Sequence, residues 1–292
     1  NCQSKIAVLR DTLERFLVPE ADGANASMLW PDNYEIGLAR YSEPGARIMA
    51  EIRPLGYVHS DGVTHRQRLA TLVEALRAGG NTPLVGSYLE TIEFLLGGIA
   101  ISNGFQSSVD VVKSSTQPRC YVRGMSDQEI CGVNNNHLVV LTDGMSHRER
   151  MNTEIYACDD QACETTIGQR IQQRANNNNL DNYLASALAR SLITVDPQTS
   201  AIVSGIRTHT IAYDLGDGAC VDRVATPTST VDYLCNWAKD GGGGSYTAQD
   251  QAGLESAFQS LIGNVRLSES FAASVPGLSI NQSSRFSFLD DV

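Results

Sequence analysis

The stretch that decides the fold is Leu138-Val-Val-Leu-Thr-Asp-Gly144. Its first four residues are all apolar, and polar residues lie on both sides of them. A short run of this kind is typical of a strand in a parallel sheet, because helices cover both faces of such a sheet. The Asp-Gly pair that follows is a turn signal. We therefore predict a buried central strand that ends just before Asp143.

The segments on either side of this strand alternate between helical and strand patterns. Apolar residues recur at helical spacing over residues 6–17, 69–76, 85–96, 180–193, 229–238 and 254–262. Strand patterns cover residues 33–41, 46–55, 208–214 and 245–248. This order predicts an α/β fold with a doubly wound, mostly parallel central sheet that is flanked by helices and carries long loop insertions. We place this domain over residues 1–266, and we interpret residues 267–292 as a linker toward a following domain.

Composition and charge exclude several classes of protein. The 292 residues are 42% hydrophobic and 19% charged, which is ordinary for a globular protein. No apolar run approaches the ~20 residues of a membrane helix, so we expect no membrane span. With 22 basic and 33 acidic residues the net charge is −11, which disfavours nucleic acid as a partner because proteins that bind nucleic acid normally carry a basic excess.

Six of the seven cysteines fall into pairs that are close in sequence, and each pair brackets a polar stretch typical of a loop. The pairs are Cys120 with Cys131, Cys158 with Cys163, and Cys220 with Cys235. We predict disulfides rather than zinc ligands or free thiols, because no second pair stands near Cys158 and Cys163 to complete a zinc site. Disulfides indicate export to the periplasm or beyond. No signal peptide precedes the first helix, so we expect a piece of a longer precursor, with the partner of Cys2 outside this chain.

Two segments offer oxygen ligands at positions where ligands of α/β proteins bind, at the ends of strands. Asp143 closes the central strand, and Thr82 opens a helix within Asn81-Thr-Pro-Leu84. Both side chains suit a hard divalent cation such as Mg²⁺. Each also has a simpler interpretation, because Thr82 before Pro83 is a good helix N-cap and Asp143-Gly144 is a good turn. Two oxygen donors are too few for tight binding in this chain.

Other motifs point to chemistry less strongly. His59 and His65 could chelate a metal, although the residues between them are typical of a loop. Gly241–Gly244 is followed by Ser245-Tyr246 instead of the Lys-Ser/Thr of a phosphate-binding loop, which favours a turn before a strand. The Gly-x-Ser-x-Gly motif of hydrolases does not occur in the sequence. We therefore expect no enzymatic activity.

The order of these motifs resembles a von Willebrand factor A-type domain. The resemblance rests on a helix, a hairpin of strands and a further helix, then Gly79-Gly-Asn-Thr-Pro-Leu84 and Val139-Val-Leu-Thr-Asp-Gly144. It implies that Thr82 and Asp143 are the second and third pieces of a metal-ion-dependent adhesion site. The first piece, Asp-x-Ser-x-Ser at the end of a first strand, does not occur in this sequence. We expect that strand upstream, so a divalent cation (Mg²⁺ or Ca²⁺) is expected only in the full-length protein.

Later segments narrow the resemblance to the A-type domain of type IV pilus tip adhesin and biogenesis proteins, which are large secreted proteins with a C-terminal β-propeller. These segments are Thr210–Asp214, Ala238–Ala248, Leu254–Phe258, Ser270–Asn281 and Phe288–Val292. The resemblance implies adhesion and pilus assembly at the pilus tip or cell surface after export through the periplasm, with minor pilins or tip components as partners and an unidentified receptor. Two alternatives remain: a mechanically stabilising structural module without a functional metal site, and a hydrolase on an α/β sheet.

Overall fold

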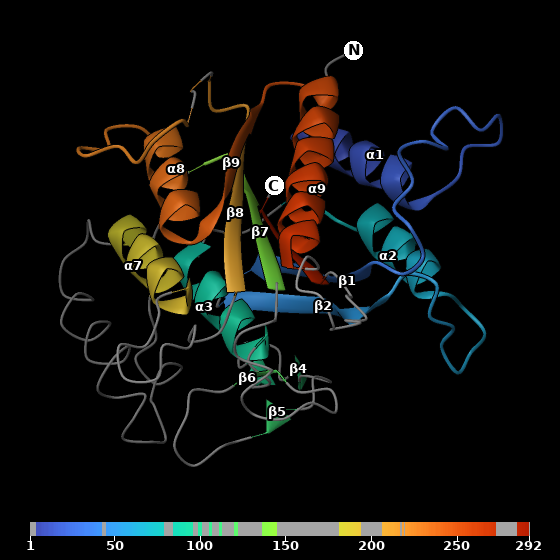
Figure 1. The fold of residues 1–292 in the computed structure, drawn as a ribbon. Coiled ribbons are helices and arrows are strands. Elements are labelled where there is room, and N and C mark those ends of the chain that lie inside the picture. Colours follow the sequence, from blue (N-terminus) through green and yellow to red (C-terminus); the bar gives the residue numbers. More distant parts are fainter. Residues whose placement is uncertain are drawn as a thin grey trace.

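The computed structural model describes residues 4–42, 45–78, 84–95, 99–100, 105–106, 111–112, 120–121, 136–144, 181–193, 206–216, 218, 220–272 and 285–291. Their main feature is a six-stranded sheet with the order β2-β1-β10-β7-β8-β9 (Figure 1). Its strands are β1 (Glu35–Ser42), β2 (Gly45–Pro54), β7 (Asn136–Thr142), β8 (Ile206–Tyr213), β9 (Gly242–Ala248) and β10 (Arg285–Asp291). Two small sheets are formed by β3 (Ile99–Ala100) with β4 (Phe105–Gln106) and by β5 (Val111–Val112) with β6 (Cys120–Tyr121).

The large sheet is mostly parallel. Strand β10 pairs in parallel with β1 and β7, and β8 pairs in parallel with β7 and β9. Strand β2 runs antiparallel to β1, as the turn signal between these two strands predicts. The α/β fold class predicted from the sequence is confirmed.

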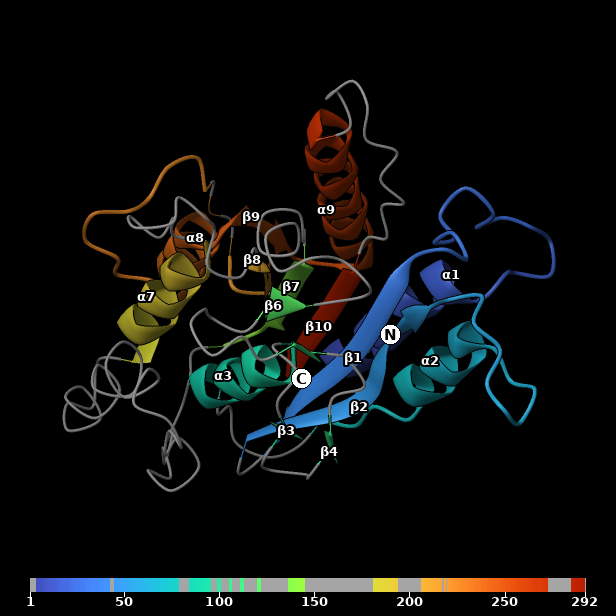
Figure 2. The ribbon, with the colours of Figure 1, turned by 60° about the horizontal axis from the view of Figure 1, so that its bottom comes forward.

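Helices lie on both faces of this sheet. Helices α3 (Leu84–Leu95), α7 (Asp181–Ile193) and α8 (Thr230–Asp240) belong to one buried cluster. Helices α1 (Lys5–Leu17), α2 (His65–Glu74) and α9 (Gln251–Ala272) belong to the other. In Figure 2 the two layers stand on opposite sides of the sheet.

The apolar run of β7 is explained by this double covering. Leu138 and Val140 belong to the cluster with α3, α7 and α8, whereas Val139 and Leu141 belong to the cluster with α1, α2 and α9. All four side chains are almost completely buried. Successive residues of a strand point to opposite faces, so a strand between two helix layers needs apolar residues at every position.

Side-chain caps set the beginnings of three helices. The hydroxyl of Ser4 accepts a hydrogen bond from the backbone N–H of Ala7 at the start of α1. Capping boxes begin α2, with Thr64 and Gln67, and α8, with Ser229 and Asp232. A cap satisfies backbone N–H groups that have no partner in the first turn. This explains why α2 begins at His65, earlier than the apolar spacing alone predicts.

The C-terminal segment differs from the expected linker in two places. Helix α9 continues through Ala272, and Arg285–Asp291 forms β10 in the middle of the sheet. A central strand supplied by the end of the chain has its partners far away in the sequence, so no local signal announces it. The domain boundary at residue 266 and the first strand upstream of the chain stay predictions.

The glycine run before β9 also differs from the expectation. Gly242, Gly243 and Gly244 are part of β9 and do not form a turn ahead of it. A Cβ atom on Gly243 would lie 2.0 Å from the backbone oxygen of Thr208 in β8. The glycines therefore permit a close approach of two backbones.

Among the helices of the described residues, none combines the length and apolar character that a membrane crossing requires.

Candidate functional site

Two carboxylates meet one ammonium group at the carboxyl edge of the parallel strands. Asp143 directly follows β7, and Asp214 directly follows the neighbouring strand β8. Lys5, the first residue of α1, places its Nζ 3.1 Å from Oδ2 of Asp143 and 3.1 Å from Oδ2 of Asp214. Three segments that are far apart in the sequence thus converge at one point.

The backbone holds both carboxylates in place. The hydroxyl of Thr142 accepts a hydrogen bond from Gly144 N–H (3.2 Å) and donates one to Gly144 C=O (2.9 Å), which fixes the turn around Asp143. Asp214 has a left-handed backbone conformation with φ of 54°. Its N–H donates to the carbonyl of Ala248 at the end of β9 (2.8 Å). Asp tolerates this conformation better than most residues.

The cluster faces solvent. The side chains of Lys5 and Asp143 are 38% and 30% exposed, and that of Asp214 is 51% exposed. Partial burial lowers the pKa of Lys5, but hydrogen bonds to Asp214 and Asp143 and their negative charges more than offset this, so the net pKa is raised. Lys5 therefore carries its charge at neutral pH. Exposed ion pairs contribute little to stability, typically about 0–1 kcal/mol each.

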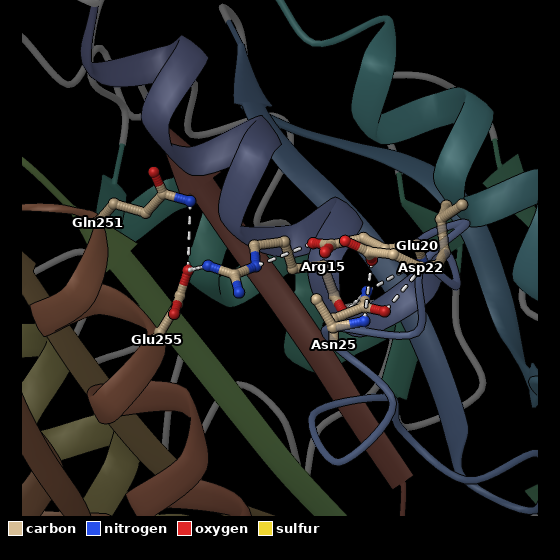
Figure 3. A network of polar contacts seen from close by, with 8 residues as sticks. Arg15, Glu20, Asp22, Asn25, Gln251 and Glu255 are labelled. Atoms are coloured by element: carbon tan, nitrogen blue, oxygen red, sulfur yellow. Dashed lines mark hydrogen bonds and ion pairs between the residues drawn. The ribbon is translucent and has the colours of Figure 1, made fainter.

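A network of polar contacts anchors the other end of α1 (Figure 3). Arg15 forms an ion pair with Glu255 of α9 (2.6 Å), and Gln251 donates to the same carboxylate (3.2 Å). The buried amide of Asn25 donates to the carbonyls of Arg15 (2.8 Å) and Val18 (2.7 Å). These bonds tie the end of α1 to α9 and to the loop that follows α1.

Oxygen donors gather at this edge of the sheet. Asp143 and Asp214 present oxygen donors, the ligand type that Mg²⁺ and Ca²⁺ prefer. The register of β10 adds two more acidic residues at the same end, because Asp290 pairs with Leu141 and Asp291 with Thr142. Across the described part of the chain, however, no three His, Cys, Asp or Glu residues are arranged to hold a metal ion.

The structure describes one of the two predicted cation ligands. Asp143 lies at the strand end that the sequence predicts, whereas Thr82 lies outside the described residues, so their proximity stays a prediction. Asp214 and Lys5 were missed. The signal for Asp214 was present, because it follows the strand over residues 208–213 as Asp143 follows β7. Lys5 carried no such signal, since nothing local shows that the start of α1 reaches this edge.

One of the three predicted disulfides lies within the described residues. Cys220 and Cys235 are bonded, with their Cα atoms 5.5 Å apart, and the bond joins the loop after β8 to α8. This pairing is confirmed. Cys2, Cys131, Cys158 and Cys163 lie outside the described residues, and only the strand position of Cys120 in β6 is described.

The histidine pair considered as a metal chelate is engaged in hydrogen bonds. Nε2 of His65 lies 2.8 Å from the carbonyl oxygen of Ile36, so this nitrogen is a donor. Nδ1 of His65 lies 3.3 Å from Nε2 of His59 and accepts from it. Both nitrogens of His65 are used in this way, which favours a structural role for the pair.

A second histidine pair, which the sequence did not reveal, is buried between β7 and β8. His209 Nδ1 accepts from the N–H of Gly244 (3.0 Å), so His209 Nε2 carries the proton and donates it to Nδ1 of His137 (2.8 Å). Burial lowers the pKa of His209 to about 4, with a smaller contribution from Arg207, and burial also lowers the pKa of His137. Both imidazoles are therefore neutral at pH 7.

Comparisons with known proteins add little. No family model and no curated protein matches the chain. Among solved structures, the conserved hypothetical protein BatB from Bacteroides thetaiotaomicron is similar with a TM-score of 0.40 and 11% sequence identity, over 90% of this chain and 89% of that one. A similarity of this size does not bear on function.

Proposed function

We propose that this chain is a von Willebrand A-type binding domain of a type IV pilus-associated protein and that it binds its partner at the carboxyl edge of the sheet. The observation that carries the proposal is the gathering of Asp143 and Asp214 around one cation, the ammonium of Lys5. Carboxylates on adjacent parallel strands lie where ligands of α/β sheets bind.

The order of elements supports the assignment. Helix α1 is followed by the β1–β2 hairpin, by α2 and α3, by the short strands β3 to β6, and then by the buried strand β7 with Asp143 directly after it. This is the order from which the resemblance was drawn. Pilus assembly and attachment, minor pilins or tip components as partners, and an extracellular or cell-surface location follow from that resemblance and belong to the proposal.

The proposal includes a divalent cation only for a longer chain. A strand ahead of α1 that ends in Asp-x-Ser-x-Ser would add oxygen ligands to those of Thr82 and Asp143. A bound Mg²⁺ or Ca²⁺ would offer a coordination position to a carboxylate of the partner. Lys5 would then lose its partners, because one cation replaces another between the same carboxylates.

Attachment by the full-length protein tests this function. Asp143→Ala should abolish attachment of pilus-bearing cells, and a chelator should abolish attachment of the parent strain. The matched control is Asp61→Ala. Asp61 lies in the loop before α2, and its exposed carboxylate pairs with Arg68 of α2. Normal attachment with a correctly folded Asp143→Ala domain would overturn the cation-dependent function.

One observation favours a structural module as the second candidate. Lys5 already pairs with both carboxylates and offsets half of their charge, so the position between them is filled by the chain itself. In that case Lys5→Met should lower the free energy of unfolding without creating cation binding. Neither Asp143→Ala nor a chelator should change attachment. The two functions therefore predict opposite results in the same assays.

A further inference from the structure

The large sheet ends in two edge strands of opposite character. Strand β2 forms one edge and contains Arg47, Glu51, Arg53 and Pro54, and its pairing with β1 has two register shifts. Charges, proline and bulges are features that keep an edge strand from pairing with another chain. Strand β9 forms the other edge, and its sequence Gly-Gly-Gly-Ser-Tyr-Thr-Ala contains neither a charged residue nor a proline. Of the two edges, only that of β2 is protected by its own residues.

The larger side chains of β9 are engaged inside the chain and do not shield the outer side of the strand. The hydroxyl of Ser245 accepts a hydrogen bond from Thr210 of β8 (2.9 Å). The ring of Tyr246 lies over Gly244, since a Cβ atom on Gly244 would be 2.5 Å from the Tyr246 hydroxyl oxygen. That hydroxyl accepts from the amide of Asn264 in α9 (2.9 Å). The strand is partly exposed along most of its length, so its outer side presents mainly backbone N–H and C=O groups.

Opposite charges lie at the two ends of β9. At its start, the guanidinium of Arg207 in β8 donates to the carbonyl of Gly242 (3.3 Å). Within the described part of the chain, no carboxylate forms an ion pair with this guanidinium. Just after the end of β9, the carboxylate of Asp250 accepts from the N–H of Gly253 in α9 (2.8 Å). An antiparallel neighbour of the same sequence therefore brings each Arg207 near Asp250 of the other copy, because the start of one strand lies beside the end of the other.

We propose that β9 pairs antiparallel with β9 of a second copy of this chain, so that two six-stranded sheets join into one continuous sheet. The two strands are then related by a twofold axis, the commonest symmetry of protein dimers. Because β9 carries no charge, the pairing sets no like charges opposite each other within the strands. The net charge of −11 on each copy opposes association, but at physiological ionic strength exposed charges are screened beyond about 8 Å.

The pairing sets the direction of the two candidate sites. In each copy Asp143 and Asp214 lie at the carboxyl edge of the parallel strands. Antiparallel pairing of β9 turns the carboxyl edges of the two copies in opposite directions, so the dimer presents one candidate site at each end. Only this consequence rests on the proposed function, since the pairing of β9 does not depend on what the carboxyl edge binds.

Sedimentation equilibrium of the 292-residue chain tests whether the dimer forms. One pair of edge strands buries little surface, so we expect a weak dimer with a Kd on the order of 10–100 µM. The measurement covers protein concentrations well below and well above this value. A chain that stays monomeric over the whole range would overturn the proposal and leave the β9 edge to a strand of a different protein.

Hydrogen exchange shows which edge forms the interface. Amides of β9 should exchange several-fold more slowly in a concentrated sample than in a dilute one, because their partners on the second copy protect them. Amides of β2, the opposite edge, should exchange at the same rate in both samples. A dimer in which β2 gains protection, or in which β9 does not, would place the interface elsewhere and contradict the pairing.

A charge on the edge strand should weaken the dimer. Thr247→Lys places on β9 the kind of residue that protects other edge strands, and it should raise the Kd at least about 10-fold. The matched control is Thr71→Lys on the exposed side of α2, a helix that contacts β2 at the other end of the sheet, and it should leave the Kd unchanged. A Thr247→Lys chain that has the circular dichroism spectrum of the parent and dimerises equally well would overturn the proposal.

The antiparallel direction has a test of its own, which stays informative if Thr247→Lys fails to fold. Arg207→Glu sets two like charges near each other at both ends of the strand pair and should raise the Kd at least about 10-fold, whereas Arg207→Lys should keep it close to that of the parent. An unchanged Kd for Arg207→Glu would contradict the antiparallel pairing. Dimerisation is measured without cations or cells, so failure of the proposed function would leave this result standing, and the reverse also holds.

Discussion

Asp143 and Asp214 share one ammonium group, that of Lys5, which lies 3.1 Å from an oxygen of each. The two carboxylates end neighbouring parallel strands, so their proximity is a consequence of the β7–β8 register, in which Thr142 pairs with Ala212. Without a cation between them, their negative charges would repel each other. The ammonium of Lys5 lies between the two carboxylates and offsets part of this repulsion.

Removal of this ammonium should expose a weak cation site. The 292-residue chain should show no submicromolar binding of Mg²⁺, Mn²⁺ or Ca²⁺, because Lys5 competes and too few oxygens are available. Lys5→Met should produce measurable millimolar binding in titration calorimetry. Its free energy of unfolding should change by no more than about 1 kcal/mol, since the ion pairs are exposed.

Lys239→Met is the matched control, because Lys239 is an exposed lysine in the last turn of α8. It should leave cation binding undetectable. If Lys5→Met also binds no cation at millimolar concentration, the two carboxylates do not form the core of a cation site.

Two glycines with opposite surroundings should respond oppositely to alanine. A Cβ atom on Gly243 would collide with the backbone of Thr208, whereas one on Gly263 in α9 meets nothing within 4 Å. Gly243→Ala should lower the free energy of unfolding by about 1–3 kcal/mol or more, because β8 and β9 must separate. Gly263→Ala should raise it by up to about 1 kcal/mol through helix propensity. Urea denaturation measures both, and a neutral Gly243→Ala would contradict the close strand approach.

Much of the fold could be predicted because its signals are local. The apolar run of β7, the hairpin turn between β1 and β2, and the helical spacing of α1, α3, α7 and α9 each depend on residues close in sequence. Strand β10 and the Lys5 bridge could not be predicted, because their partners are set by tertiary structure. The turn predicted over the glycines was wrong for a related reason. Glycine is typical of turns, but it also allows two backbones to approach closely, as it does in β9.

The confirmed disulfide should contribute measurably to stability. The bond between Cys220 and Cys235 closes a loop with a sequence separation of 15, for which restriction of the unfolded chain corresponds to about 3 kcal/mol. Replacing both residues by alanine should lower the free energy of unfolding by about that amount in urea denaturation.

The other predicted pairs can be read from a non-reduced digest by mass spectrometry. It should contain the peptides linked by Cys120–Cys131 and Cys158–Cys163 as well as Cys220–Cys235. Cross-linked combinations of these cysteines, or thiols open to alkylation in the folded protein, would contradict both the pairing and the oxidising compartment.

The buried histidine pair should make the protein sensitive to mild acid. The pKa of His209 is lowered to about 4 in the folded chain, compared with an ordinary value of 6.5. Between these values the unfolded chain binds a proton that the folded chain excludes, so the free energy of unfolding falls as the pH falls from 6.5 to 4. The size of the effect is about 3 kcal/mol for a shift of this magnitude. Urea denaturation at a series of pH values measures it.

His209→Gln separates this effect from the titration of carboxylates over the same range. The amide can replace the hydrogen bonds to Gly244 and His137 but does not titrate, so the variant should be less stable at pH 7. It should lose less stability than the parent protein between pH 6.5 and pH 4, and the loss that remains includes the contribution of His137, whose pKa burial also lowers. His59→Gln, in the half-buried pair with His65, is the control and should keep the slope of the parent protein. Parallel pH profiles for His209→Gln and the parent protein would mean that His209 does not govern the acid response.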